Sequence, residues 1–426
     1  MIEQVNIANG IKIYSILNPN LKSFCLSLYI RAGSIFEEDF ENGISHLFEH
    51  TVFRNLKRKY PKFYELLAFH GLDFQGSTYK EFIRFTLSGP YYELDFALDV
   101  LCSLFDKIEL NPADFVSEKK RIKAEIREAD ERNSLDFFFN NIVWENTQAQ
   151  KTVLGYCKVI DRISVKKLNE FREKILTKNN FFIYATGNIS KEGIDKTAQK
   201  LALLNVGDSE WENRNVITVS NEFFNRDGKI KVKDDKWHYI EIGFDIDTSK
   251  FSGGTYDLLY AILFSGDIAL VHNYLSEDNP IMYSFSSTHE QYDNIGNLNF
   301  KFEVDKDMIL AALNIVVDML NAVKRGEFNY EANLKAELCS IELEADDPDD
   351  FNWSMAYNNH ILKTDPVNYA QEKFGRFKNV SKEQVIQAAC EIFKTRNMTV
   401  AIKGKKKKIK TEELEKVFQK LEKVND

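Results

Sequence analysis

The stretch N-F-F-I-Y-A-T-G-N, residues 180–188, has a counterpart near the end of the chain in N-M-T-V-A-I-K-G, residues 397–404. Both are short apolar runs that reach a Gly, a pattern typical of buried strands. Upstream of each run a Ser precedes a helical pattern, Ser164 in the first copy and Ser381 in the second, as an N-cap would. All of these pairs are 217 residues apart. This shared register indicates that the chain is an internal duplication.

The duplication predicts two halves, 1–205 and 225–426, joined by a polar linker at 206–224. Periodicity in the first half predicts alternating strands and helices. The strands are expected at 11–17, 23–32 and 84–88, and the helices at 43–56, 61–69, 93–108 and 112–130.

Composition excludes several classes of partner. The chain has 426 residues and a formal net charge of −9, and a nucleic-acid ligand would require a basic face to neutralise its phosphates. The single basic run, Lys403 to Lys410, is interpreted as a solvated loop. No window approaches the 18 or so apolar residues that a membrane span requires, so no membrane partner is expected.

The cysteines and the N-terminus suggest a compartment. The five cysteines are an odd number without a C-x-x-C spacing, which favours reduced thiols. The first fifteen residues lack the basic and apolar regions of a secretory signal. We therefore expect a cytoplasmic protein.

The segment H-L-F-E-H, residues 46–50, is the only close pair among the seven histidines. On a helix, His46 and His50 project from one face and can bind one metal ion, while Glu49 lies on the same side. H-x-x-E-H is the inverted form of the zincin motif. The alternatives are a surface helix that carries two incidental histidines, or one core histidine whose hydrogen bonds are satisfied.

A catalytic zinc site also needs a third protein ligand and an open position. The segment E-K-K-R-I-K-A-E-I-R-E, residues 118–128, places Glu118 and Glu125 seven residues apart on one helix face. By spacing alone, either carboxylate could face a metal. Taken by itself, the segment is better explained as an ordinary charged helix with ion pairs along its surface.

Together these segments resemble the pitrilysin/insulinase family of zinc peptidases, which includes the mitochondrial processing peptidase. That family combines H-x-x-E-H with a later E-x6-E helix whose second Glu binds the metal. The resemblance assigns this role to Glu125, 75 residues after His50, and puts Glu118 at the first Glu. It implies a site in which zinc is held by His46, His50 and Glu125.

A second motif carries the resemblance further. Between the two helices, the family has a G-G-x-x-N-A-x-T or N-G-S-T stretch, and this chain reads H-G-L-D-F-Q-G-S-T-Y-K-E-F-I-R-F over residues 70–85. The matching positions are Gly71, Gly76, Ser77, Thr78, Glu81 and Phe85. Gln75 replaces the usual Asn, and His70 replaces a Gly and is given no role.

The resemblance covers nearly the whole chain and implies an α+β fold of two homologous α/β sandwich domains, each a mostly antiparallel sheet covered by helices. It implies a zinc metalloendopeptidase with Glu49 as general base, which takes a proton from water and passes it to the leaving amine. Glu118 would assist catalysis by orienting a ligand or its helix.

The resemblance also implies how substrate binds. An extended peptide would add to the edge of the strand after Gly76, so that Gln75, Gly76, Ser77 and Thr78 contact substrate. In the second half, N-P-I-M-Y-S-F-S-S, residues 279–287, resembles a family segment whose Tyr contacts the substrate backbone, here Tyr283. Tyr283 could equally be a core strand residue. The Arg that accompanies this Tyr in many members is replaced by Ser276.

Because that Arg is missing, we expect a dimer. The partner is either a paralogue without H-x-x-E-H, which supplies the Arg, or a second copy of the chain. Two other functions stay open: a non-catalytic structural subunit of the same fold, and a metal-stabilised module that binds peptides.

Overall fold

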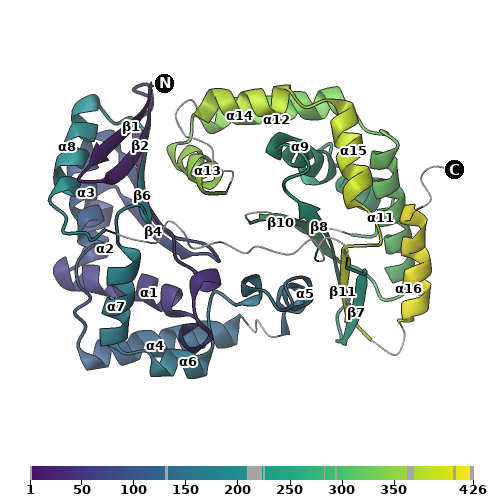
Figure 1. Cartoon of the computed structure of the whole chain (residues 1–426), viewed down its shortest axis with the longest axis horizontal. Helices are drawn as coiled ribbons and strands as arrows, with labels where there is room; N and C mark the ends of the chain where they lie inside the picture. The colour runs from purple at the N-terminus through teal and green to yellow at the C-terminus, as the bar shows by residue number, and fades with distance from the viewer. Residues whose placement is uncertain are drawn as a thin grey trace. The chain divides into compact units, whose positions relative to one another are not determined.

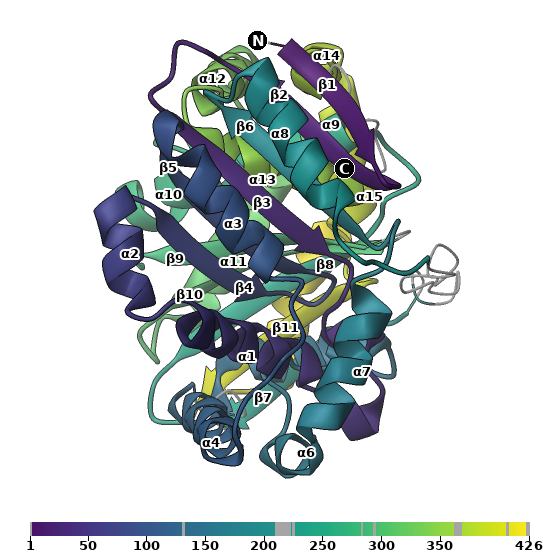
Figure 2. The same ribbon diagram turned by 90° about the vertical axis from the view of Figure 1, so that its left-hand side faces the viewer.

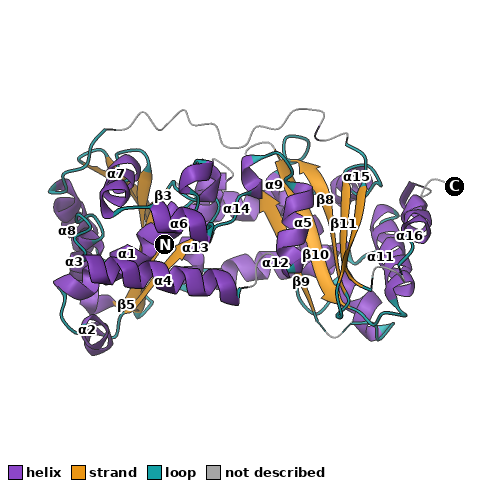
Figure 3. Cartoon of the chain, turned by 90° about the horizontal axis from the view of Figure 1, so that it is seen from below, coloured by secondary structure: helices purple, strands orange, loops and turns teal. Residues whose placement is uncertain are grey.

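A computed structural model describes residues 2–129, 133–208, 223, 226–282, 284–292, 295–361, 369–405 and 409–422. The chain forms two compact units. Unit 1 consists of Met1–Asp130, Gln148–Val216 and Glu342–Tyr369, and unit 2 of Glu131–Thr147, Ile217–Ile341 and Ala370–Asp426. Each unit contains one sheet and its own hydrophobic core (Figures 1 and 3).

The sheet of unit 1 has six strands in the order β1-β2-β6-β3-β5-β4. Only β2 and β6 run parallel, and every other neighbouring pair is antiparallel. The strands are β1 (Ile2–Ala8), β2 (Ile11–Leu17), β3 (Ser23–Ile30), β4 (Asp73–Thr78), β5 (Ile83–Pro90) and β6 (Phe181–Gly187). The central strand β6 is buried along its full length, and β4 is an edge strand.

Helices cover both faces of this sheet. Helices α3 and α8 lie on one face, and α13 (Pro348–Ile361) packs on β3 and β6 from the opposite face (Figures 1 and 2). Helix α1 packs against α4 and α7, α4 packs against α6, and both α1 and α2 contact the edge strand β4. The bounds of the helices of unit 1 other than α13 are α1 (Ile44–Lys59), α2 (Phe63–His70), α3 (Leu94–Ser103), α4 (Pro112–Glu128), α6 (Cys157–Arg162), α7 (Val165–Ile175) and α8 (Lys191–Ala202).

The sheet of unit 2 repeats this plan with five strands in the order β7-β11-β8-β10-β9. Its strands are β7 (Lys229–Asp234), β8 (Tyr239–Asp247), β9 (Phe285–Gln291), β10 (Ile295–Glu303) and β11 (Met398–Gly404). Its helices are α5 (Leu135–Val143), α9 (Gly253–Phe264), α10 (Leu270–His272), α11 (Ile309–Lys324), α12 (Tyr330–Glu344, whose last residues belong to unit 1), α14 (Tyr369–Lys378), α15 (Lys382–Ile392) and α16 (Thr411–Phe418).

The two sheets confirm the predicted fold class. The order β2-β6-β3-β5-β4 corresponds strand for strand to β7-β11-β8-β10-β9, and in each sheet the first pair is parallel and the others antiparallel. Ser164 caps α7 and Ser381 caps α15, each through its hydroxyl oxygen, and these helices lead to β6 and β11. The register of 217 residues therefore corresponds to one repeated set of elements.

The compact units differ from the sequence halves because they exchange one helix each. Helix α5, from the first half of the sequence, packs on β8 and β11 of unit 2, and α13, from the second half, packs on unit 1. The boundaries 1–205 and 225–426 stay a prediction about the duplicated sequence. Most of the proposed linker at 206–224 lies outside the described residues.

The local predictions need two corrections. The predicted helix at 93–108 ends at Ser103. The strand expected after Gly76 instead contains it, because β4 spans Asp73–Thr78. This strand has no apolar alternation that periodicity could detect, and it forms because it pairs with β5.

Both exchanged helices cover polar positions of their sheets. In unit 1, the side chain of Asn352 on α13 is fully buried and donates to the carbonyl of Tyr184 on β6, and the Ser27 hydroxyl donates to Asn352. Arg84 on β5 forms an ion pair with Asp349 of α13 and lies over the Trp353 ring.

In unit 2, the polar positions on β8 are acidic. Asp245 accepts two hydrogen bonds from Arg226, whereas Oε2 of Glu241 is buried without a hydrogen-bond partner among the described residues. Lys301, opposite Glu241 on β10, forms an ion pair with Asp136 of α5. Burial, reinforced by the charge of Asp136, raises the pKa of Glu241 to about 8.

This pKa predicts a pH-dependent stability. Between about pH 4.3 and about pH 8, Glu241 is protonated in the folded chain and ionised in the unfolded chain. The free energy of unfolding therefore falls as pH rises through this window, by roughly 1.4 kcal/mol per pH unit. Glu241→Gln should remove this slope, as measured by urea unfolding at about pH 5.5 and pH 7.5. The control Glu303→Gln, exposed on the neighbouring strand β10, should retain it. An unchanged slope in Glu241→Gln would contradict the assignment.

Among the described residues, no helix is long and apolar enough to cross a membrane. All five cysteines are free thiols in the structure.

Candidate metal and catalytic site

Helix α1 carries the H-x-x-E-H segment and is fixed at its N-terminus by a buried carboxylate. Glu37 accepts hydrogen bonds from the backbone N–H groups of Gly43 and Ser45 and from the side chain of Asn42. Gly43 has a φ of 96°, and a Cβ there would meet the Cα of Gly155 at 2.9 Å. The start of the helix, three residues before His46, is therefore held by these hydrogen bonds and by the close packing of Gly43 against Gly155.

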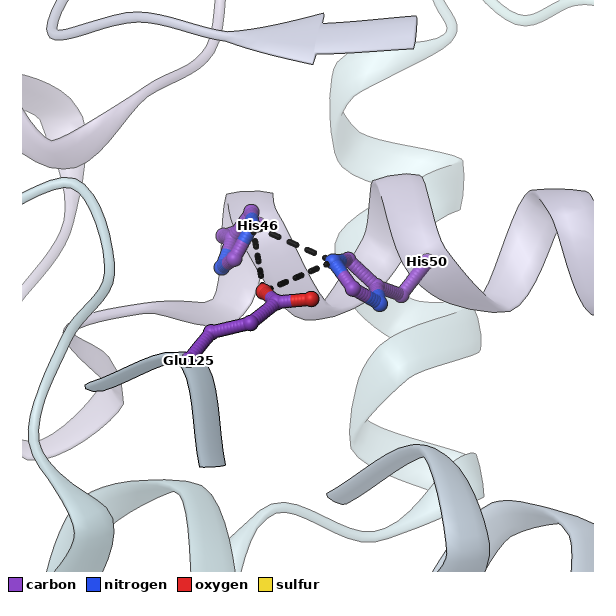
Figure 4. Close-up of side chains that lie close together, drawn as sticks. All are labelled: His46, His50 and Glu125. Atoms are coloured by element: carbon purple, nitrogen blue, oxygen red, sulfur yellow. Dashed lines mark hydrogen bonds and ion pairs between the residues drawn. The ribbon is translucent and has the colours of Figure 1, made fainter. Parts of the chain in front are cut away.

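The structure brings His46, His50 and Glu125 together (Figure 4). The Nε2 atoms of the two histidines are 3.2 Å apart, and Oε2 of Glu125 on α4 lies 3.3 Å from Nε2 of His50 and 3.7 Å from Nε2 of His46. Bonds of about 2.0–2.1 Å at tetrahedral angles would place zinc ligands about 3.3 Å apart. The two nitrogens and one oxygen thus fit three corners of a tetrahedral zinc site.

Burial keeps His46 neutral, which is the form of the imidazole that binds a metal ion. The pKa of His46 falls to about 3, chiefly because the side chain is buried and secondly because His50 is adjacent. A neutral imidazole has a free lone pair, so His46 can bind a metal at neutral pH.

Glu118 lies behind His50 and is almost completely buried. One oxygen accepts from Nε of Arg54 at 2.7 Å, and the other is 3.6 Å from Nδ1 of His50. Burial alone would raise the pKa of Glu118, but the contacts with His50 and the charge of Arg54 outweigh it and lower this pKa. Glu118 is thus an ionised group placed to orient His50.

Glu49 lies beside the three possible metal donors and is not one of them. Its carboxylate accepts a hydrogen bond of 2.7 Å from the hydroxyl of Thr78 on β4. Burial raises its pKa, although the Thr78 bond and the nearby His50 oppose this rise. A carboxylate whose pKa is raised toward neutrality is suited to accept and release a proton.

Four of the five residues expected to contact substrate lie on the edge strand β4, which pairs with β5 on one side only. Gln75 is exposed, while Gly76, Ser77 and Thr78 are half-buried. A Cβ on Gly76 would lie 2.6 Å from the Phe53 ring and 3.2 Å from Cγ of Glu49. Gly76 therefore allows the strand to approach α1 closely at the carboxylate of Glu49.

A cavity of ≈ 170 Å³ opens at this site, between α1, α2 and α4. Its walls include His50 and Glu125, two of the three possible metal donors, together with Glu49, and it extends along α1 toward its C-terminus. Its walls are formed by Glu49, His50, Phe53, Arg54, Lys57, Tyr64, Glu118, Arg121 and Glu125.

Other predicted residues lie elsewhere. His70 is not part of the cavity wall: its Nδ1 is 2.6 Å from Oε2 of Glu93, and its ring stacks on Phe96. Ser276 lies in unit 2, on a single π-helical turn at Asn273–Glu277. Tyr283 lies outside the described residues, so its proposed contact stays a prediction.

Sequence reasoning missed Arg54, Glu37 and Lys57. Arg54 had a detectable signal, because it follows His50 by one helical turn and so shares its face. Glu37 had none, because its partners at the start of α1 are backbone N–H groups. Lys57 could not be distinguished from the other cations of L-K-R-K at 56–59 without the cavity.

Comparison with known proteins gives a consistent result. The family described as "Insulinase (Peptidase family M16)" matches residues 12–156, and "Peptidase M16 inactive domain" matches 162–333. An "Uncharacterized zinc protease" of Rickettsia bellii is 23% identical over 416 residues, which span 93% of this chain and 95% of that protein. The beta subunit of the mouse mitochondrial-processing peptidase is 24% identical over 234 residues, 54% of this chain and 47% of that one.

Solved structures show the same two-unit fold. A protease from Helicobacter pylori superposes with a TM-score of 0.83 at 17% identity, covering 95% of this chain and 99% of that one. The periplasmic protease PqqL from Escherichia coli has a TM-score of 0.77 at 15% identity, covering 100% of this chain and 50% of that one. The family models together match most of the chain, in the same order as its two duplicated halves. The chain therefore belongs to the insulinase family of peptidases, peptidase family M16.

Proposed function

We propose that this chain is a zinc metalloendopeptidase that hydrolyses extended, unfolded peptides. The observation that carries the proposal is the convergence of His46, His50 and Glu125 at the spacing of a tetrahedral zinc site, with Glu49 beside them. When bound, zinc supplies Lewis-acid chemistry that makes water nucleophilic near pH 7.

The residues of the chain supply the proton transfer and the orientation. The carboxylate of Glu49 takes a proton from the attacking water and passes it to the leaving amine. The Thr78 hydroxyl holds that carboxylate in place. Glu118 keeps the ring of His50 in position and is itself held by Arg54.

The same strand that carries Thr78 would bind the substrate. The free edge of β4 can pair with an extended peptide through main-chain hydrogen bonds, which folded proteins cannot offer. Because Thr78 bonds to Glu49, a peptide on this edge would lie next to the proposed base.

The first prediction from the proposed function separates metal binding from catalysis. His46→Ala and Glu125→Ala should each lose zinc, as measured by metal analysis of the purified protein. Glu49→Gln should retain zinc and lose turnover by roughly 10²–10⁴-fold, because it removes only the proton acceptor. Phenanthroline should abolish activity in the unmodified chain, and added zinc should restore it.

The control for this set is His70→Ala, which removes a histidine that does not line the cavity. It should retain both zinc and activity. Full peptidase activity in Glu49→Gln would contradict the mechanism.

The second prediction concerns the close approach of β4 to α1. Gly76→Ala should displace the strand from Phe53 and Glu49, and so reduce kcat/KM for peptides by about tenfold or more while zinc stays bound. The matched control is Gly207→Ala, where a Cβ would meet nothing nearer than 4.0 Å. Equal activity in both variants would argue against a role for β4 in catalysis.

We further propose that the chain works as part of a dimer. The proposal rests on Ser276, which stands where many family members have an Arg, and on the name of the mouse relative, which is a subunit of a peptidase. An Arg would donate charge-assisted hydrogen bonds to the peptide that Ser cannot replace, and one such missing donor costs roughly 2–4 kcal/mol.

The third prediction tests this assembly. If a paralogue without H-x-x-E-H supplies the missing donor, mixing it with this chain should give a heterodimer by light scattering and raise peptidase activity by about 10²-fold. A homodimer that is fully active alone, and that the paralogue does not stimulate, would contradict the division of labour between two different chains.

The cytoplasmic location also stays a proposal. It rests on the odd number of cysteines, which favours a reducing compartment. Fractionation of cells that express the full chain would test it.

A further inference from the structure

The far end of the cavity differs in charge from the end at the metal site. Near the metal site, each carboxylate has a cationic or hydrogen-bonding partner: Glu118 is paired with Arg54, and Glu125 lies 3.6 Å from Arg121. The remaining cation in the wall is Lys57, which lies almost two helical turns beyond His50 on α1. A helix rise of 1.5 Å per residue puts it about 10 Å along the helix from that histidine.

Among the described residues no ion pair reaches the ammonium group of Lys57, which instead lies 4.5 Å from the centre of the Tyr64 ring. By contrast, its neighbours on the helix are paired: Arg58 with Glu109 and Lys59 with Asp106. The half-buried Lys57 therefore presents an uncompensated positive charge to the cavity.

The walls between this charge and the metal site are partly aromatic. Phe53 and Tyr64 both line the cavity, and the Tyr64 ring holds the ammonium of Lys57 at its end. A volume of ≈ 170 Å³ is enough for one side chain of moderate size and too small for a folded segment. A ligand that fits would be a short chain that ends in a negative charge.

We propose that this cavity is a specificity pocket that binds a carboxylate of the substrate through Lys57. The inference rests on the proposed peptidase function and deepens it: the favoured peptides carry Glu or Asp next to the cleaved bond, or end in a free carboxylate at that distance. Both sources offer the same group to Lys57, and a charge-assisted hydrogen bond to it is stronger than a neutral one. Basic side chains are disfavoured at this position because they would face Lys57 and Arg121.

The test uses a series of otherwise identical peptides with Glu, Gln or Lys at the position next to the cleaved bond, amidated at the C-terminus. The unmodified chain should cleave the Glu peptide about tenfold faster in kcat/KM than the isosteric Gln peptide, and the Lys peptide slowest. Lys57→Gln should remove the difference between Glu and Gln, and Lys57→Glu should reverse the order. The matched control Arg58→Gln removes the same charge one residue away, outside the cavity, and should retain the preference.

Two further measurements distinguish the possible outcomes. Binding of the same peptides to Glu49→Gln, by fluorescence anisotropy, should show the same order of affinity without requiring turnover. A second set of peptides with a free C-terminus shortly after the cleaved bond identifies the source of the carboxylate. If only these peptides are preferred over their amidated forms, and Glu is not preferred over Gln, the pocket binds chain ends rather than acidic side chains.

Failure of this inference is distinct from failure of the proposed function. If no peptide is cleaved although zinc is bound, the peptidase assignment falls, while the binding series still decides the role of Lys57. If peptides are cleaved and bound without a difference between Glu and Gln, the pocket assignment is wrong. If Lys57→Gln and Arg58→Gln lose the preference for Glu equally, only the overall positive charge of α1 acts on the peptide. That result would also overturn the pocket assignment.

Discussion

The buried carboxylate of Glu37 accepts hydrogen bonds from the first backbone N–H groups of α1, and the geometry of the site depends on this contact. The N-terminus of a helix has unsatisfied donors and a partial positive charge, so an anion there fixes where the helix begins. His46 is the third residue of that helix. Any shift in the start of α1 would rotate His46 and His50 away from Glu125, because all three donors meet only if both helices keep their register.

The duplicated fold carries the possible metal donors only in its first copy, within the described residues. Unit 2 repeats the strand order of unit 1, yet its helix α9, G-G-T-Y-D-L-L-Y-A-I-L-F, contains no histidine. Within the part of the chain that the structure describes, the group formed by His46, His50 and Glu125 is the only one that could hold a metal ion. The fold is thus a scaffold, and side chains on α1 and α4 give one copy a group that could hold a metal ion.

The sequence predicted the local parts of the site better than the distant ones. The spacing of His46 and His50 fixes their common face, because four residues make about one helical turn. Spacing could not choose between Glu118 and Glu125, since both lie on the same face of α4. The resemblance to the family made that choice, and the structure places Glu125 in the group of three donors and Glu118 behind His50.

The features that the sequence did not predict depend on contacts between distant residues. The edge strand β4 is polar and contains Gly76, so only its pairing with β5 defines it as a strand. The exchange of α5 and α13 is invisible to local patterns, because both helices would look the same on either sheet. Their partners, such as Asn352 with the carbonyl of Tyr184, are separated by well over a hundred residues.

The three carboxylates Glu118, Glu125 and Glu49 are suited to three different roles because their surroundings differ. Glu118 is held ionised by Arg54 and His50 despite its burial. Glu125 is the most exposed of the three and faces two imidazole nitrogens, so it can share a cation with them. Glu49 has a single hydroxyl partner, and burial raises its pKa. Environments that separate the pKa values of neighbouring acids also suit them to different functions. The proposed chemistry therefore depends on the partners Arg54 and Thr78 as much as on the acids themselves.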